Sequence, residues 1–264
     1  MTKTFPTYQE LKSAWNKTYR GETLDVSKKT VSLYEARFNP VRANYMKTTQ
    51  HANIDTDVFC SKLDKILANE KIATLSLGNL AWLLTINTAP IETYHSLLIC
   101  STHFEQQLSQ KSLNDLHAIS LLYPDLSIGF NGWGAGASQK HLHAQVVFSG
   151  FPIAKWEKDP VLHTIKNYPG ICFYFYSPDH CLETIEQLER AHIPYNVLLT
   201  NGCIYLAPRK NEFDQNNTKR GFDSVFGNIP LLRQEDYDLA TEEQISEIIA
   251  YLLYQTMEIN YTPA

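Results

Sequence analysis

Two histidines and a glutamine alternate along the segment His141-Leu142-His143-Ala144-Gln145. On a β-strand, alternate residues face the same side, so His141, His143 and Gln145 would project together while the residues between them pack into a core. Imidazole is a competent nucleophile toward phosphorus near neutral pH, because one ring nitrogen is largely unprotonated, and the phosphoramidate can pass its group to a second acceptor. The pattern predicts His143 as the nucleophile. We expect His141 to orient it, with its backbone carbonyl accepting the other ring N–H.

A glycine-rich loop lies directly before this segment, with three glycines among residues 132–136. Glycine lets the backbone approach a ligand closely and lets successive N–H groups surround a phosphate. The loop is therefore predicted to bind phosphate, and its candidate residues are Asn131, Gly134, Gly136 and Ser138.

Gln145 limits the chemistry of the predicted site. An amide side chain can hold a phosphate oxygen, but it has no titratable proton with which to act as a general acid. The leaving group should therefore already be a stable anion, such as a sugar phosphate or a nucleoside phosphate, and the acceptor should be phosphate rather than water. Alternating histidines are also a common metal-binding arrangement, or can be polar residues of an edge strand, so these alternatives stay open.

Hydrophobic periodicity predicts an α+β fold of antiparallel sheets with packed helices. A helix near the N-terminus is expected from Tyr8, Leu11 and Trp15, which recur at helical spacing. The further helices expected are at 106–122, 182–192 and 242–258, and the strands at 31–38, 80–86, 95–100, 126–130, 139–148, 197–200 and 204–208. We predict an N-terminal helix and linker over 1–30, a catalytic half over 31–150 and a second, degenerate half over 151–264.

Composition excludes several classes of partner. Of the 264 residues, 44% are hydrophobic and 19% are charged, which is ordinary for a globular protein. A formal net charge of -5 gives no basic field to hold nucleic acid or an anionic membrane. The first residues turn polar at once, so we expect no signal or membrane segment and a cytoplasmic protein. The oligomeric state is not predicted.

Cysteine usage gives no sign of a metal or redox site. The five cysteines are scattered and contain no Cys-x-x-Cys pair. We therefore expect buried thiols, no metal ligand and no cofactor.

The motif resembles the histidine triad superfamily in its transferase branch, which contains galactose-1-phosphate uridylyltransferase, diadenosine tetraphosphate phosphorylase and the GDP-hexose phosphorylases. His-x-His-x-Gln after a Gly/Ser-rich loop is the shared pattern, and residues 90–99, 193–198 and 233–237 extend the similarity over roughly residues 80–250. The resemblance implies two fused histidine-triad-like halves in one chain. It also implies that His143 is the nucleophile and that Gln145 replaces the third histidine of the hydrolases.

Four further residues are candidates for the nucleotide site. Lys155 would bring positive charge to the phosphates, since polyphosphate cleavage moves negative charge onto the leaving group. His95 would support the site or its own strand, and Arg37 or Arg42 would contact base, ribose or sugar. A surface lysine and a buried core histidine are the simpler alternatives for Lys155 and His95.

The predicted reaction is cleavage of a nucleoside-diphosphate hexose, GDP-hexose being favoured, by phosphate through a covalent nucleotidyl-His143 intermediate. One alternative is a dinucleoside polyphosphate phosphorylase, or a nucleotidyl transferase with another acceptor. Another is a non-catalytic nucleotide-binding module on the same scaffold.

Overall fold

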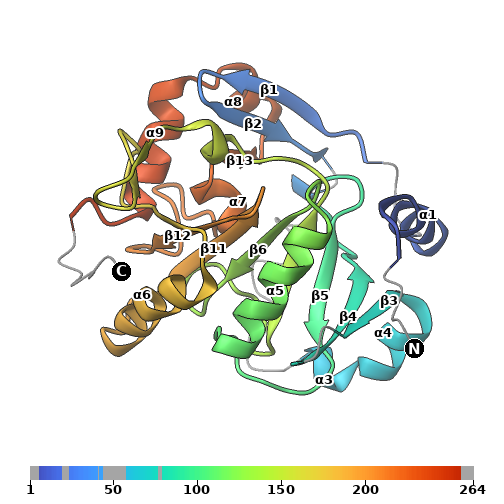
Figure 1. Cartoon of the computed structure of the whole chain (residues 1–264). Helices are drawn as coiled ribbons and strands as arrows, with labels where there is room; N and C mark the ends of the chain where they lie inside the picture. The colour runs from blue at the N-terminus through green and yellow to red at the C-terminus, as the bar shows by residue number, and fades with distance from the viewer. Residues whose placement is uncertain (1–5, 20–23, 41, 44–57, 77–78, 257–264) are drawn as a thin grey trace.

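A ten-stranded antiparallel sheet runs through the protein (Figure 1). The computed structural model describes residues 6–19, 24–40, 42–43, 58–76 and 79–256. The strands lie in the order β3 (Lys71–Ser76), β4 (Ala81–Ile86), β5 (Ser96–Cys100), β7 (His143–Val147), β6 (Ser127–Asn131), β11 (Tyr195–Thr200), β12 (Cys203–Pro208), β10 (Phe173–Phe175), β9 (Thr164–Ile165) and β8 (Lys158–Asp159).

Helices cover one face of this sheet. α5 (Gln110–Leu122) and α6 (Pro178–Arg190) lie side by side across it, and α1 (Tyr8–Thr18) lies toward the β3 edge (Figure 1). The capping residues Thr7, Ser109 and Ser177 begin these helices by accepting backbone N–H groups of the first turn. The core below the helices includes Leu98, Ala144 and other alternate strand residues.

The opposite face carries a second core, which includes Val147 and Leu198. It is covered by α9 (Glu242–Leu252), α7 (Phe222–Val225) and a three-stranded sheet of β1 (Ser27–Val31), β2 (Tyr34–Phe38) and β13 (Asn228–Leu231), in which β13 runs parallel to β2. Short elements complete the chain: α3 (Val58–Ser61), α4 (Leu63–Asn69), η1 (Pro152–Lys155) and α8 (Gln234–Asp238). Ala144 faces the helices. Because side chains alternate along a strand, His143 and Gln145 lie on the opposite, second face.

The predicted α+β class with antiparallel sheets is confirmed, but several element bounds are wrong. The single strand predicted at 31–38 is a hairpin, in which Ser32 turns the chain with a φ of 55°. The strand predicted at 139–148 begins only at His143, and the helix predicted from 106 begins at Gln110 because Ser109 is its N-cap. The closing helix ends at Leu252, and part of its predicted range, 257–258, lies outside the described residues.

The predicted halves meet at the pairing of β6 with β11, with five strands on each side of the seam. In the N-terminal region α1 is present as expected, while the predicted linker partly lies outside the described residues and its end, from Ser27, forms β1. The duplication and the boundary at residue 150 stay predictions. No helix in the described part of the chain is long and apolar enough to span a membrane.

Candidate active site

His143 is the first residue of β7, between β5 and β6 in the middle of the large sheet, and its side chain is buried. Its Nδ1 atom lies 2.8 Å from the backbone carbonyl oxygen of His141. A carbonyl oxygen only accepts, so Nδ1 carries the proton and the ring lone pair is on Nε2. The expected contact between the His143 ring and the His141 carbonyl is present in the structure.

Gln106 fixes the backbone around His143. Its side-chain oxygen accepts the N–H of His143 at 2.8 Å, while its amide nitrogen donates to the carbonyl oxygens of Asn131 at 2.8 Å and His143 at 3.0 Å. The buried amide thus joins the end of β6 to the start of β7. Sequence reasoning placed Gln106 within a helix and missed this role, for which the local sequence carries no signal.

Gln145 lies two residues along β7 from His143, and its side chain acts on His95 in the direction that raises the pKa of that imidazole. Nδ1 of His95 accepts the N–H of Ile91 at 3.0 Å, so the ring proton is on Nε2. The side-chain nitrogen of Asn87 also lies 3.3 Å from Nε2 of His95. If the Gln145 side-chain oxygen accepts the ring N–H of His95, the amide nitrogen of Gln145 is the group that can donate to a ligand.

His95 is neutral at any pH near 7. Burial, reinforced by the positive charge of Arg42, lowers its pKa to about 3. It is therefore neither an acid nor a base near neutral pH.

Two backbone carbonyls of the glycine-rich loop accept hydrogen bonds from side chains of the protein. Asn196 donates to the carbonyl oxygen of Ala135 at 2.8 Å, and Lys219 donates to that of Ala137 at 2.8 Å. In a trans peptide the N–H points opposite to the C=O, and the described chain has no cis peptide. The N–H groups of Gly136 and Ser138 therefore point away from these two donors.

Gly136 is required by its surroundings. Its φ is +98°, and a Cβ atom at this position would lie 2.6 Å from the carbonyl oxygen of Arg220. Gly134 also has a positive φ, of 76°, while Ser138 is exposed at the end of the loop.

Two buried residues of the predicted second half support this loop. Arg209 donates to the side-chain oxygen of Asn196 at 2.7 Å, and Asn196 donates to the side-chain oxygen of Asn131 at 2.8 Å. Burial lowers the pKa of Arg209 to about 10, so it remains a cation near neutral pH. Both side chains position the loop from beneath.

Arg37 and Arg42 differ in what they bind. The guanidinium of Arg37 donates to Glu35 at 2.5 Å, to Glu92 at 2.9 Å and to Ser149 at 3.3 Å, so all three of its nitrogens are engaged inside the protein. Burial opposes ionisation of Glu92, but the charges of Arg37 and Lys28 outweigh it and lower the pKa of this carboxyl. Arg37 is thus part of a buried ionic network.

Arg42 is half-buried and donates to the carbonyl oxygen of Ala89 at 2.8 Å. It lines a narrow pocket with Asn39 and Asp223, and its charge acts on both His95 and Asp223. Burial raises the pKa of Asp223, a residue of α7 that sequence reasoning missed. Lys155, exposed at the end of η1, stays a prediction.

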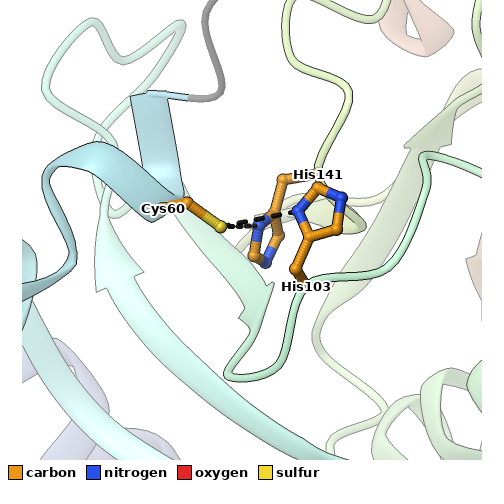
Figure 2. A group of neighbouring side chains, drawn as sticks. All are labelled: Cys60, His103 and His141. Atoms are coloured by element: carbon orange, nitrogen blue, oxygen red, sulfur yellow. Dashed lines mark hydrogen bonds between the residues drawn. The ribbon is translucent and has the colours of Figure 1, made fainter.

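Aromatic and metal-ligand side chains gather beside the histidine pair. Phe59 of α3 lies edge-on to the rings of His143 at 5.1 Å and His141 at 5.8 Å, measured between ring centroids. The ring of His141, which precedes β7, lies beside Cys60 and His103 (Figure 2). These three side chains could hold a metal ion. Their separation in the sequence hid the cluster.

Comparison with known proteins identifies the family. Residues 8–147 match the family described as GDPGP1-like, N-terminal domain. The chain belongs to this family. It is 28% identical over 213 residues to GDP-D-glucose phosphorylase 1 of Danio rerio, covering 64% of this chain and 61% of that protein. It is 26% identical over 200 residues to GDP-L-galactose phosphorylase 1 of Arabidopsis thaliana, covering 62% of this chain and 45% of the relative.

The fold is shared with a solved enzyme. Yeast Ap4A phosphorylase Apa2 in complex with AMP superposes with a TM-score of 0.67 at 14% identity, covering 93% of this chain and 97% of that one. This likeness confirms the predicted fold. The chain spans less than two thirds of the length of the curated relatives named above.

Proposed function

We propose that this protein is a GDP-hexose phosphorylase that works through a covalent guanylyl-His143 intermediate. In the first step Nε2 of His143 bonds to the α-phosphorus of GDP-hexose, and the bond from that phosphorus to the bridging oxygen breaks, releasing hexose 1-phosphate. In the second step an oxygen of inorganic phosphate attacks the same phosphorus. The bond to Nε2 breaks, GDP leaves and the histidine is regenerated.

The observation that carries this proposal is the 2.8 Å contact between Nδ1 of His143 and the carbonyl oxygen of His141. It fixes the tautomer that has its lone pair on Nε2. It also places a carbonyl dipole against the ring N–H, where positive charge develops as Nε2 bonds to phosphorus. Gln106 holds the backbone of His143, so the ring needs little reorganisation before attack.

The neighbours of His143 fit transfer rather than hydrolysis. Gln145 offers an amide N–H to a phosphate oxygen and no acidic proton to the leaving group. Hexose 1-phosphate leaves as an anion and needs no such proton. The N–H groups of Gly136 and Ser138, which point away from Asn196 and Lys219, are suited to the phosphate oxygens.

We assign the nucleotide contact to Arg42 in preference to Arg37. Both side chains line the pocket with Asp223, but the guanidinium of Arg37 is held by ion pairs with Glu35 and Glu92. Guanine is favoured because the named relatives act on GDP sugars, according to their names. A cytoplasmic location, and the absence of nucleic-acid and membrane partners, belong to the same proposal.

The reaction is tested with GDP-hexoses, other nucleotide sugars and dinucleoside polyphosphates, each with and without inorganic phosphate. We expect phosphate-dependent release of GDP and hexose 1-phosphate. Faster phosphorolysis of a dinucleoside polyphosphate would favour the alternative substrate class, and release of GMP independent of phosphate would overturn the phosphorylase assignment.

The intermediate is tested by intact-mass spectrometry after mixing with GDP-hexose in the absence of phosphate. We expect an adduct of one guanylyl group that disappears when phosphate is added. His143→Ala should lack the adduct, and His180→Ala, at a partly exposed histidine of α6, should retain it. Binding without any adduct or turnover would instead support the non-catalytic module.

A further inference from the structure

We propose that Cys60, His103 and His141 form a zinc site beside the active site. They come from α3, the loop after β5 and the segment before β7, and their side chains converge (Figure 2). One ligand atom from each residue lies within 4.8 Å of the other two. The sequence named no metal ligand among the candidate site residues but left metal binding by the alternating histidines open. The expectation of a buried thiol is wrong for Cys60, which is exposed. The zinc site does not depend on the proposed reaction.

The ring of His141 is oriented as a metal-bound histidine would be. Its Nε2 atom lies 2.7 Å from the carbonyl oxygen of Cys100, which only accepts, so the proton is on Nε2. The lone pair is therefore on Nδ1, which faces Sγ of Cys60 at 3.3 Å. Histidines that bind metals commonly donate their other ring N–H to a carbonyl or carboxylate oxygen in this way.

His103 presents the same ring nitrogen, Nδ1, to Cys60. Its Nδ1 atom faces Sγ of Cys60 at 3.4 Å, and its Nε2 atom lies 3.9 Å from the carboxylate of Glu105. The backbones that carry the two histidines are held together, because Leu142 N–H donates to the carbonyl oxygen of Phe104 at 2.8 Å. This backbone bond fixes the segments from which the Nδ1 atoms of His103 and His141 face Sγ of Cys60.

The separations and the donor types suit Zn²⁺. Tetrahedral zinc with Zn–S of about 2.3 Å and Zn–N of about 2.0–2.1 Å places sulfur and nitrogen roughly 3.6 Å apart. The observed distances from Sγ of Cys60 to the two Nδ1 atoms are 3.3 and 3.4 Å. One thiolate and two imidazoles fill three positions, and the fourth position would take water or another ligand. A thiolate with imidazoles selects a borderline-soft ion over Mg²⁺ or Ca²⁺.

The site would hold the active site together without using the nucleophile. His143 is outside the cluster, and its Nδ1 atom is bonded to the backbone of His141 rather than to the metal. Zinc would tie α3 to the sheet and so keep Phe59 of that helix beside the His143 ring. We assign it a structural role.

The test uses full-length protein produced in zinc-supplemented medium, dialysed and analysed for metal. We expect about one zinc per chain, at least a tenfold loss of zinc in Cys60→Ala and in His103→Ala, and normal content in His180→Ala. Zinc should also raise the Tm of the wild type after metal removal, but not that of Cys60→Ala.

Cobalt reconstitution of metal-free wild type keeps the proposal testable if a variant fails to fold. Tetrahedral Co²⁺ gives intense visible bands, and a thiolate ligand adds a near-ultraviolet charge-transfer band. Zinc far below one per chain with no Co²⁺ uptake would overturn the proposal. Retention of both zinc and the thiolate band in Cys60→Ala would overturn it too. Lost activity with intact zinc would bear on the reaction alone.

Discussion

The guanidinium of Arg209 donates to the side-chain oxygen of Asn196 at 2.7 Å, and this bond fixes which way the Asn196 amide points. With its oxygen held, Asn196 turns its nitrogen toward Asn131 at 2.8 Å and Ala135 at 2.8 Å. Asn196 of β11 and Arg209, which directly follows β12, thereby set the conformation of the glycine-rich loop before β7. The large sheet makes this possible, because β6 pairs with β11 and brings Asn131 opposite Asn196.

Replacement of Arg209 should therefore impair the distant loop. Arg209→Ala leaves the side-chain oxygen of Asn196 and several backbone carbonyls without this donor, so we expect the free energy of unfolding to fall by about 1–3 kcal/mol for each buried acceptor left unsatisfied. Asn196 would lose its orientation, and kcat should fall with it. Urea denaturation and steady-state kinetics measure the two effects. Arg190→Ala, at an exposed residue of α6, is the control, and equal behaviour of the two variants would refute the role of Arg209.

Gln106 offers a second test of positioning. Gln106→Ala leaves the buried N–H of His143 and two carbonyl oxygens without this partner, at about 1–3 kcal/mol for each unsatisfied group. Gln106→Glu restores an acceptor but no donor, so we expect it to recover only part of the activity. A purely structural role would lower stability while kcat of the folded fraction stayed normal. Gln234→Ala, at an exposed residue, should match the wild type.

The sequence allowed a prediction of the candidate nucleophile and phosphate loop, but not of most residues that hold them in place. The spacing of His141, His143 and Gln145 is local, so strand alternation and the glycine-rich loop were enough to predict a nucleophile and its phosphate site. The bond from Nδ1 of His143 to the carbonyl of His141 is likewise local and was expected.

The remaining features depend on pairing between distant segments. Gln106 lies 37 residues from His143, and Cys60 lies 81 residues from His141. No periodicity in the sequence reports such contacts, because they are set by strand order and by how α3 packs. Arg37 was a candidate ligand contact because of its residue type. In the structure its guanidinium is instead paired with the carboxylates of Glu35 and Glu92.

Stability should fall in acid because of His95. Its pKa is about 3 in the folded protein and about 6.5 when unfolded, so between these values the unfolded chain binds a proton that the folded protein does not. Stability due to this group is full above about pH 6.5 and decreases by up to about 1.4 kcal/mol per pH unit as the pH is lowered toward 3.

Urea denaturation at a series of pH values from 7 to 5 measures this slope. His95→Gln removes the titrating group, so its stability should depend less steeply on pH than that of the wild type. Identical slopes would show that His95 is protonated in the folded protein.

Gly136 and Gly150 form a matched pair for testing the phosphate loop. Gly136→Ala forces a side chain into a φ of +98° and brings Cβ to 2.6 Å from the carbonyl oxygen of Arg220, so the loop must move. A strained conformation of this kind costs about 1–3 kcal/mol, and displacement of the Gly136 N–H should weaken binding of the nucleotide phosphates. Gly150→Ala meets nothing within 4 Å and should leave stability and kinetics unchanged. We expect a raised KM for GDP-hexose in Gly136→Ala only, and normal kinetics in that variant would place the phosphate elsewhere.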